Sequence, residues 1–129
     1  MLGKKKDEEI NAFLGKGAEF SGKLFFNGSV RIDGDFHGEI LGGGILVVGE
    51  GARVRANINI DSVLISGGVH GHVDVKERLE IFPTGKLVGN VKTPIFVIRE
   101  GGIFEGTSRM DSGENETVGA DIAAVGVAR

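Results

Sequence analysis

Residues 30–40 read Val30-Arg31-Ile32-Asp33-Gly34-Asp35-Phe36-His37-Gly38-Glu39-Ile40, a run in which apolar or glycine positions alternate with charged or polar ones. Successive side chains of a β-strand point to opposite faces, so this period of two predicts a strand and not a helix. The even-numbered residues of the run are expected to point inward and the odd-numbered ones outward. A second run is expected to turn the following residues inward: Val63, Ile65, Gly67, Val69, Gly71, Val73 and Val75.

Such runs recur along the chain at a nearly constant interval. Six apolar positions expected to begin strands are separated by 17, 16, 17, 16 and 17 residues: Phe13, Val30, Leu46, Val63, Leu79 and Phe96. A second cluster of the form apolar-x-small-x-apolar begins at five positions, namely Phe20, Phe36, Val54, Val69 and Leu87. A sixth copy begins at Phe104 and ends at Ser108, without its final apolar residue. This regularity indicates a structural repeat.

The period of 16 to 17 residues limits the architecture. It is too short for the helical crossover of an ordinary parallel sheet, but at about 3.3 Å per residue it suits one three-sided turn of a solenoid. An antiparallel sandwich with hairpins at Asn27-Gly28, Gly42–Gly44 or Gly67-Gly68 is the alternative, which the regular recurrence disfavours. The sequence therefore predicts an all-β, single-domain parallel β-helix of about six coils over residues 13–110, with disordered tails at 1–12 and 111–129.

The composition excludes several other classes of protein. The chain has 129 residues, of which 23 are glycine, and this favours strands with tight corners over helices. It has no cysteine, so disulfides and thiolate metal sites are excluded and the cytoplasm is expected. Residues 14–110 hold eleven basic and eleven acidic side chains, so no nucleic-acid partner is expected. No long apolar run follows Met1, so neither a signal peptide nor a membrane-spanning helix is expected.

Neither end of the predicted solenoid has a capping helix. The first and last coils of such a stack expose unpaired strand edges and an apolar interior unless something covers them. No amphipathic helix is expected before Phe13 or after Met110. End-to-end association of copies is the predicted consequence.

Four segments, in order and in register, resemble the bactofilins, a family of polymer-forming bacterial cytoskeletal proteins. They are Leu14–Gly22, Val30–Ile40, Leu46–Ala52 and Gly102–Gly106, the last followed by Arg109-Met110. The resemblance implies a right-handed, roughly triangular β-helix flanked by unstructured tails. It also implies filaments that form without nucleotide or other cofactor, through alternating head-to-head and tail-to-tail contacts. No Gly-x-x-x-x-Gly-Lys-Ser/Thr loop is present in the sequence, which agrees with nucleotide independence.

The resemblance further implies a place in the cell. Bactofilin-like filaments are expected on the inner face of the cytoplasmic membrane, where their tails would localise proteins of cell shape, division or envelope synthesis. Family members often carry a short N-terminal membrane-targeting peptide. The candidates for it here are Met1, Leu2, Lys4, Lys5 and Lys6. The acidic run from Asp7 to Glu9 weakens the electrostatic attraction of these lysines to an anionic surface.

Apolar residues in the two terminal coils are the candidates for the polymer interface. The first coil offers Phe20, Leu24, Phe25 and Phe26, and the last coil offers Ile103 and Phe104. Adjacent residues in a strand point to opposite faces, so at least one of each adjacent pair is expected outside the core. For Phe104, ordinary packing in the core is the alternative.

The alternative function is that of a trimeric hexapeptide-repeat β-helix enzyme, an acyltransferase or metal-dependent hydratase with a histidine between subunits. His70 and His72 share the predicted outer face, as metal ligands can, whereas His37 lies about two coils away. No third ligand follows from the pattern, and the six-residue aliphatic register of those enzymes fails at Gly42. The sequence therefore favours a structural protein without catalytic residues, metal or cofactor.

Overall fold

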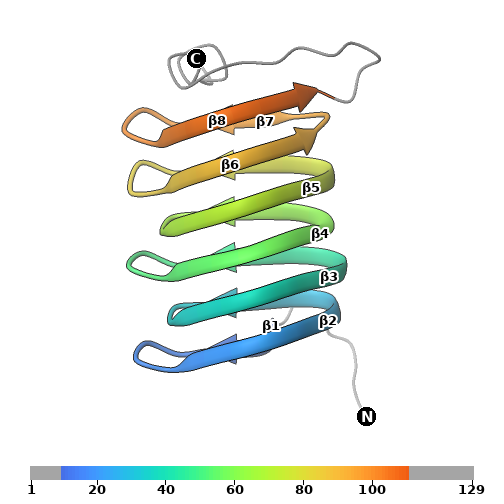
Figure 1. The fold of residues 1–129 in the computed structure, drawn as a ribbon, viewed down its shortest axis with the longest axis vertical. Coiled ribbons are helices and arrows are strands. Elements are labelled where there is room, and N and C mark those ends of the chain that lie inside the picture. Colours follow the sequence, from blue (N-terminus) through green and yellow to red (C-terminus); the bar gives the residue numbers. More distant parts are fainter. Residues whose placement is uncertain (1–9, 111–129) are drawn as a thin grey trace.

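The computed structural model describes residues 10–110, which form eight strands and no helix. The strands are β1 (Ile10–Leu14), β2 (Glu19–Ile32), β3 (Asp35–Val48), β4 (Arg53–Ile65), β5 (Gly68–Ile81), β6 (Lys86–Thr93), β7 (Phe96–Ile98) and β8 (Ile103–Met110). Neighbouring strands pair in parallel in the order β1-β2-β3-β4-β5-β6-β8, and β7 pairs with β5. Successive coils stack along one axis (Figure 1). The predicted all-β parallel β-helix of about six coils is confirmed.

The predicted boundaries differ slightly from the observed ones. β1 begins at Ile10, so Ile10–Ala12 belong to the first coil and not to a tail. The remainder of the two predicted tails lies outside the described residues. No helix long and apolar enough to cross a membrane occurs in residues 10–110.

Residues one coil apart face each other across the parallel ladder. Five of the six predicted strand starts form one column of partners: Val30, Leu46, Val63, Leu79 and Phe96. The prediction that they begin strands was wrong for the first four, which lie near the C-terminal ends of β2 to β5, whereas Phe96 begins β7. The second cluster forms another complete column: Phe20, Phe36, Val54, Val69, Leu87 and Phe104. The sequence interval therefore corresponds to one turn of the β-helix.

The first coil departs from the predicted register. Ala12 pairs with Val30, and Phe13 pairs with Arg31, so the prediction that Phe13 begins the first column was wrong. Ala12 and Val30 are 18 residues apart, one more than the interval of 17 between Phe13 and Val30, so the first coil is displaced by one residue. Because neighbouring side chains alternate, Phe13 then points away from the core and is 61% exposed.

The core lies inside the coils and follows the predicted alternation. The residues expected to point inward in the two alternating runs are buried, apart from Gly38 and Gly71, which are half-buried. Valine and isoleucine make up most of this core, and their branched side chains favour strands. Among the described residues, the buried polar or charged ones are Glu80, Thr93 and Ser108.

Pro94 interrupts the last complete coil. The buried Thr93 hydroxyl donates to the Ile95 carbonyl oxygen at 2.9 Å, and the Ile95 N–H donates to Thr93 Oγ1 at 3.3 Å. Proline has no N–H to donate to a ladder. β6 therefore ends at Thr93, and pairing resumes at Phe96 in β7.

Candidate polymerisation interface

Much of β2 has an unpaired outer edge at the N-terminal end of the stack. β1 covers only Ser29–Ile32 of β2. Glu19–Gly28 pair with β3 on one side, and no strand of residues 10–110 pairs with them on the other. The backbone N–H and C=O groups of such an edge can accept a further strand. This edge is the first element of the candidate interface.

The apolar interior also opens at the N-terminal end. Phe20 is 40% exposed, although the other residues of its column, from Phe36 to Phe104, are at most 3% exposed. Leu24 is half-buried, whereas Ile40, its partner in the next coil, is fully buried. The Phe20 ring stacks on the Phe36 ring, with centroids 5.2 Å apart and planes inclined by 11°. The buried column therefore ends in a partly exposed aromatic ring.

An apolar hollow of about 200 Å³ lies beside this ring. Every side chain that lines it is apolar: Ala12, Phe13, Leu14, Phe20, Leu24, Val30, Ile32 and Phe36. Removing apolar surface from water contributes about 25 cal/mol per Å². Covering the hollow with a complementary apolar surface is therefore expected to lower the free energy.

The C-terminal end is different, because its interior is buried. β8 pairs with β6 alone and β7 with β5 alone among the described strands, so each has a free outer edge. Phe104 is 1% exposed and meets the Phe96 ring edge-on, with centroids 5.1 Å apart and planes inclined by 82°. Ser108 is 3% exposed, whereas Ile103 points outward and is 45% exposed. This end offers free strand edges and the outward side chain of Ile103.

The predicted interface residues of the first coil occupy three environments. Phe20 and Leu24 line the hollow. Phe25 points outward and is 67% exposed, while Phe26 lies in the core and is 8% exposed. The expectation that one residue of this adjacent pair lies outside the core is confirmed. The part of each residue in a polymer contact stays a prediction.

Phe13 lines the hollow but was not predicted as an interface residue. The sequence interval predicted Phe13 only as the start of a strand. The adjacent apolar pair Phe13-Leu14 was the available signal, because only one of two neighbours in a strand can point inward. The predicted membrane-targeting residues lie outside the described residues: Met1, Leu2, Lys4, Lys5 and Lys6.

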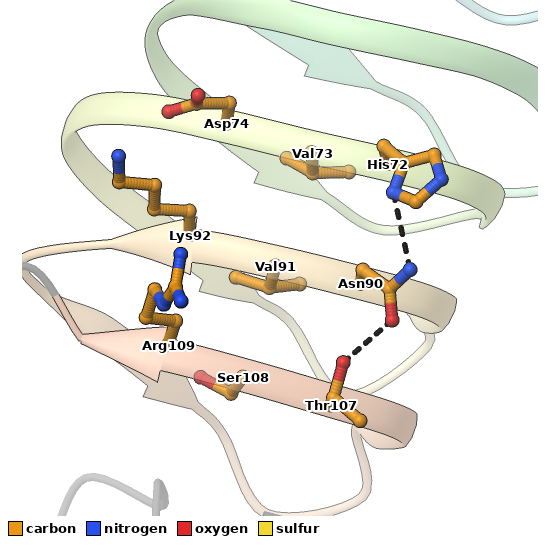
Figure 2. A pocket seen from close by; sticks show the side chains of 9 residues that line it. All are labelled: His72, Val73, Asp74, Asn90, Val91, Lys92, Thr107, Ser108 and Arg109. Atoms are coloured by element: carbon orange, nitrogen blue, oxygen red, sulfur yellow. Dashed lines mark hydrogen bonds between the residues drawn. The ribbon is translucent and has the colours of Figure 1, made fainter. Parts of the chain in front are cut away.

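The three histidines lie on the outer surface of the coils. His37, His70 and His72 are all exposed. Asn90 Nδ2 lies 3.1 Å from His72 Nδ1, and the Thr107 hydroxyl donates to Asn90 Oδ1 at 2.5 Å (Figure 2). These polar side chains form a ladder across three coils beside a surface hollow of about 420 Å³. Within residues 10–110, no group of three or more His, Cys, Asp or Glu side chains could hold a metal ion.

Comparison with known proteins places these features in a family. The bactofilin family model, described as polymer-forming cytoskeletal, matches residues 12–109. Bactofilin BacP of Myxococcus xanthus (strain DK1622) is 29% identical over 106 residues, which cover 82% of this chain and 43% of BacP. Bactofilin BacO of the same strain is 30% identical over 105 residues, which cover 81% of this chain and 82% of BacO. No solved structure matches the chain. From the match over residues 12–109 and the β-helix that they form, the chain belongs to the bactofilin family of structural, polymer-forming cytoskeletal proteins.

Proposed function

We propose that this chain assembles end to end, without nucleotide, into membrane-associated filaments that act as scaffolds in cell shape, division or envelope synthesis. The observation that carries the proposal is the open N-terminal hollow, where Phe20 is 40% exposed at the end of an otherwise buried column. A single copy leaves this apolar surface in water. Covering it with a second copy is favourable because apolar surface is then removed from water.

Two N-terminal ends meet about a two-fold axis in this scheme. The Glu19–Gly28 edge of each copy pairs with the other copy, and Phe13, Phe20 and Leu24 of each close the hollow of the other. Fully burying one Phe or Leu side chain contributes about 1.5–3 kcal/mol. These side chains are partly buried already, so each contributes less, and several must act together.

A filament needs a second kind of contact. A two-fold contact is satisfied by two copies and closes on itself. Growth therefore requires a contact at the C-terminal end, where the free β8 edge and Ile103 are available. The alternation of the two contacts produces a linear polymer without overall direction.

Nucleotide has no role in this assembly, because the energy comes from covering a preformed apolar surface and pairing preformed edges. The absence of a Gly-x-x-x-x-Gly-Lys-Ser/Thr loop from the sequence supports this part of the proposal. The enzyme alternative is set aside, since bactofilins are structural proteins and the chain belongs to that family.

Membrane attachment is assigned to Met1, Leu2, Lys4, Lys5 and Lys6. Each lysine near an anionic surface contributes on the order of 1 kcal/mol, so a single copy binds weakly. A filament displays many copies of the peptide, and their linked binding is much stronger. The segments outside the β-helix are then available to bind localised proteins.

Negative-stain electron microscopy of the purified, nucleotide-free chain tests the assembly. We expect long uniform filaments from the parent chain and only folded monomers or dimers from Phe20→Arg, because the charge prevents closure of the hollow. Val88→Arg is the matched control: Val88 is half-buried on the outer surface of β6 and does not line the N-terminal hollow. Discrete particles from the parent chain, or normal filaments from Phe20→Arg, would contradict the proposal.

A further inference from the structure

The surface hollow of about 420 Å³ beside His72 crosses three strands, β5, β6 and β8 (Figure 2). Its floor is formed by Val73, Val91 and Ser108, which are buried and partner one another across the coils. The outward residues on either side of this floor form two walls, and each wall runs along the axis of the β-helix. We call this hollow the polar groove. It extends over about 10 Å from β5 to β8.

One wall of the polar groove is held in place by its own hydrogen bonds. It consists of His72, Asn90 and Thr107, which occupy equivalent positions in successive coils. Asn90 joins the other two, because its Nδ2 lies 3.1 Å from His72 Nδ1 and its Oδ1 accepts from the Thr107 hydroxyl. Neither Asn90 nor Thr107 carries a charge. The charge that selects a ligand therefore comes mainly from the opposite wall.

The opposite wall carries two adjacent cations. It consists of Asp74, Lys92 and Arg109, which partner one another across successive coils, so the strands of the two cations lie about 4.8 Å apart. Lys92 and Arg109 are exposed and lie on the same side of the groove in Figure 2. Neither forms a salt bridge within residues 10–110, whereas Arg78 and Arg99 both pair with a carboxylate. Because neighbouring like charges repel, an anion bound between Lys92 and Arg109 is stabilising.

The position of Asp74 restricts where an anion can bind. Asp74 lies at the β5 end of the charged wall, while Lys92 and Arg109 lie toward the C-terminal end of the stack. An anionic ligand is therefore attracted to the part of the groove on β6 and β8. Two cations on different coils favour a ligand with two anionic groups a few ångströms apart. Alternate side chains of an extended polypeptide point to the same side and are about 6.6 Å apart, so an acidic polypeptide fits this requirement.

The chain itself supplies an acidic segment beside the groove. Residues 111–129 follow Met110, the last residue of β8, and Arg109 already belongs to the charged wall. Their net charge is −3, which comes from the following side chains: Asp111, Glu114, Glu116, Asp121 and Arg129.

Glu114 and Glu116 are the carboxylates best placed in the sequence to meet the two cations. They are two residues apart, and Glu114 follows Arg109 by five residues. At about 3.3 Å per residue, five residues can span up to about 16 Å, several times the distance between adjacent coils. A short linker also keeps the segment at an effective concentration on the order of mM near the groove. A free acidic peptide must reach that concentration to compete.

We propose that the polar groove is a docking surface for acidic polypeptide and that residues 111–121 of the same chain occupy it. Glu114 and Glu116 pair with Lys92 and Arg109 and relieve the repulsion between these cations. Exposed ion pairs are individually weak and are screened by salt. Docking is therefore reversible and strongest at low ionic strength. It does not depend on the proposed filaments, because the groove and the segment belong to one copy.

The absence of cysteine from the chain allows a single spin label to test this docking. A nitroxide on Thr117→Cys, next to Glu116, reports nanosecond motion of the segment by electron paramagnetic resonance in monomers and filaments alike. We expect a partly immobilised label at low salt. Lys92→Gln with Arg109→Gln, or about 0.5 M salt, should lower the immobilised fraction by at least about two-fold. Lys86→Gln is the control, because Lys86 is an exposed cation on β6 outside the groove.

Charge reversal distinguishes direct pairing from an altered strand. Lys92→Glu should free the label, and Lys92→Glu combined with Glu116→Lys should immobilise it again. A label that is mobile in the otherwise unchanged chain would overturn the proposal. Equal immobilisation with and without Lys92→Gln and Arg109→Gln would also overturn it.

A mixing experiment tests whether the segment docks on its own copy. The labelled chain that carries Lys92→Gln and Arg109→Gln is mixed with an excess of the unlabelled parent chain before assembly. We expect its label to stay mobile, since the intact grooves belong to other copies. Immobilisation in this mixture would place the segment in the groove of a neighbouring copy and overturn the proposed docking within one chain.

Discussion

Gly38 marks a position where neighbouring coils approach too closely for a side chain. Its φ is +141°, and a Cβ there would lie 1.8 Å from the Gly22 carbonyl oxygen. We expect Gly38→Ala to lower the free energy of unfolding by more than about 2 kcal/mol, since it adds positive-φ strain to a backbone clash. Urea unfolding in a Phe20→Arg background measures the effect without a contribution from assembly.

The control for this prediction is Gly68→Ala. Gly68 does not have a positive φ, and the nearest atom to its Cβ position is the Ala52 carbonyl oxygen at 3.8 Å. This change is expected to alter the free energy of unfolding by less than about 1 kcal/mol. Equal losses in the two variants would show that the close approach at Gly38 is not the reason for its glycine.

Glu80 is a nearly buried carboxylate whose two oxygens are held by arginines from successive coils. Arg99 Nε lies 2.6 Å from Glu80 Oε2, and Arg78 Nε lies 3.3 Å from Oε1. We expect Arg99→Met to lower the free energy of unfolding by about 1–3 kcal/mol, because it leaves one oxygen of a buried charge without its donor. Thermal unfolding at fixed pH measures the loss.

An exposed ion pair is the matched control for Glu80. Lys23 Nζ lies 3.7 Å from Glu39 Oε1, and the two side chains are 64% and 46% exposed. Lys23→Met is expected to change the free energy of unfolding by less than about 1 kcal/mol, since water screens such pairs. If Arg99→Met is equally mild, the Glu80 cluster contributes no more than a surface pair.

At the scale of the strand and coil, the two aromatic residues at the ends of one column should respond differently to the same change. Phe20 is 40% exposed in the first coil, whereas Phe104 is 1% exposed in the last and packs on Phe96. We expect Phe20→Arg to abolish filaments with the fold retained. Phe104→Arg should destabilise the fold itself, since truncating a buried Phe costs about 3–5 kcal/mol and a buried arginine adds to that cost.

Circular dichroism with thermal unfolding shows whether each variant is still folded. It therefore distinguishes a loss of the fold from a loss of assembly alone. Phe104→Leu is a useful companion, because it keeps an apolar side chain and should unfold at a temperature between those of the parent chain and Phe104→Arg. A folded Phe104→Arg monomer with an unchanged unfolding temperature would show that Phe104 serves the interface and not the core.

The strands and their register could be predicted where the local pattern alone determines them. In β3, period-two alternation specifies which side chains point inward, and the interval from Val30 to Leu46 specifies the neighbour in the next coil. The position of Phe13 could not be predicted in this way, because the apolar spacing fits either Ala12 or Phe13 as the partner of Val30. The burial of Phe104 depends on packing against Phe96 at the end of the stack, which alternation does not report.

As a whole, the molecule is a rod whose surfaces differ in kind. The N-terminal end has an apolar hollow, whereas the C-terminal end has free strand edges. Because each coil contacts mainly the coils next to it, stability is a sum of local terms along the axis. Changes at one end or on one side can therefore be made without altering the rest of the rod, and the proposed contacts can be tested separately.

Membrane binding is the property that depends most on the whole assembly. Three lysines of one copy contribute on the order of 3 kcal/mol at an anionic surface, which corresponds to weak binding. In a filament the same peptides are linked, so binding should rise steeply with polymerisation. We therefore expect the parent filaments to float with anionic vesicles in a density gradient. Deletion of residues 1–7 should leave filaments that do not float, and Phe20→Arg should leave the peptide on monomers that also do not float.

Flotation is preferred to sedimentation for this measurement, because filaments sediment without vesicles. Deletion of residues 111–129 is the control and should leave both filaments and flotation unchanged. High salt should weaken flotation of the parent chain, since it screens the lysines from the lipid charges. If filaments that lack residues 1–7 float as well as those of the parent chain, the N-terminal peptide does not attach the filament to the membrane. A Phe20→Arg monomer that floats fully would show that a single copy binds strongly enough without the filament.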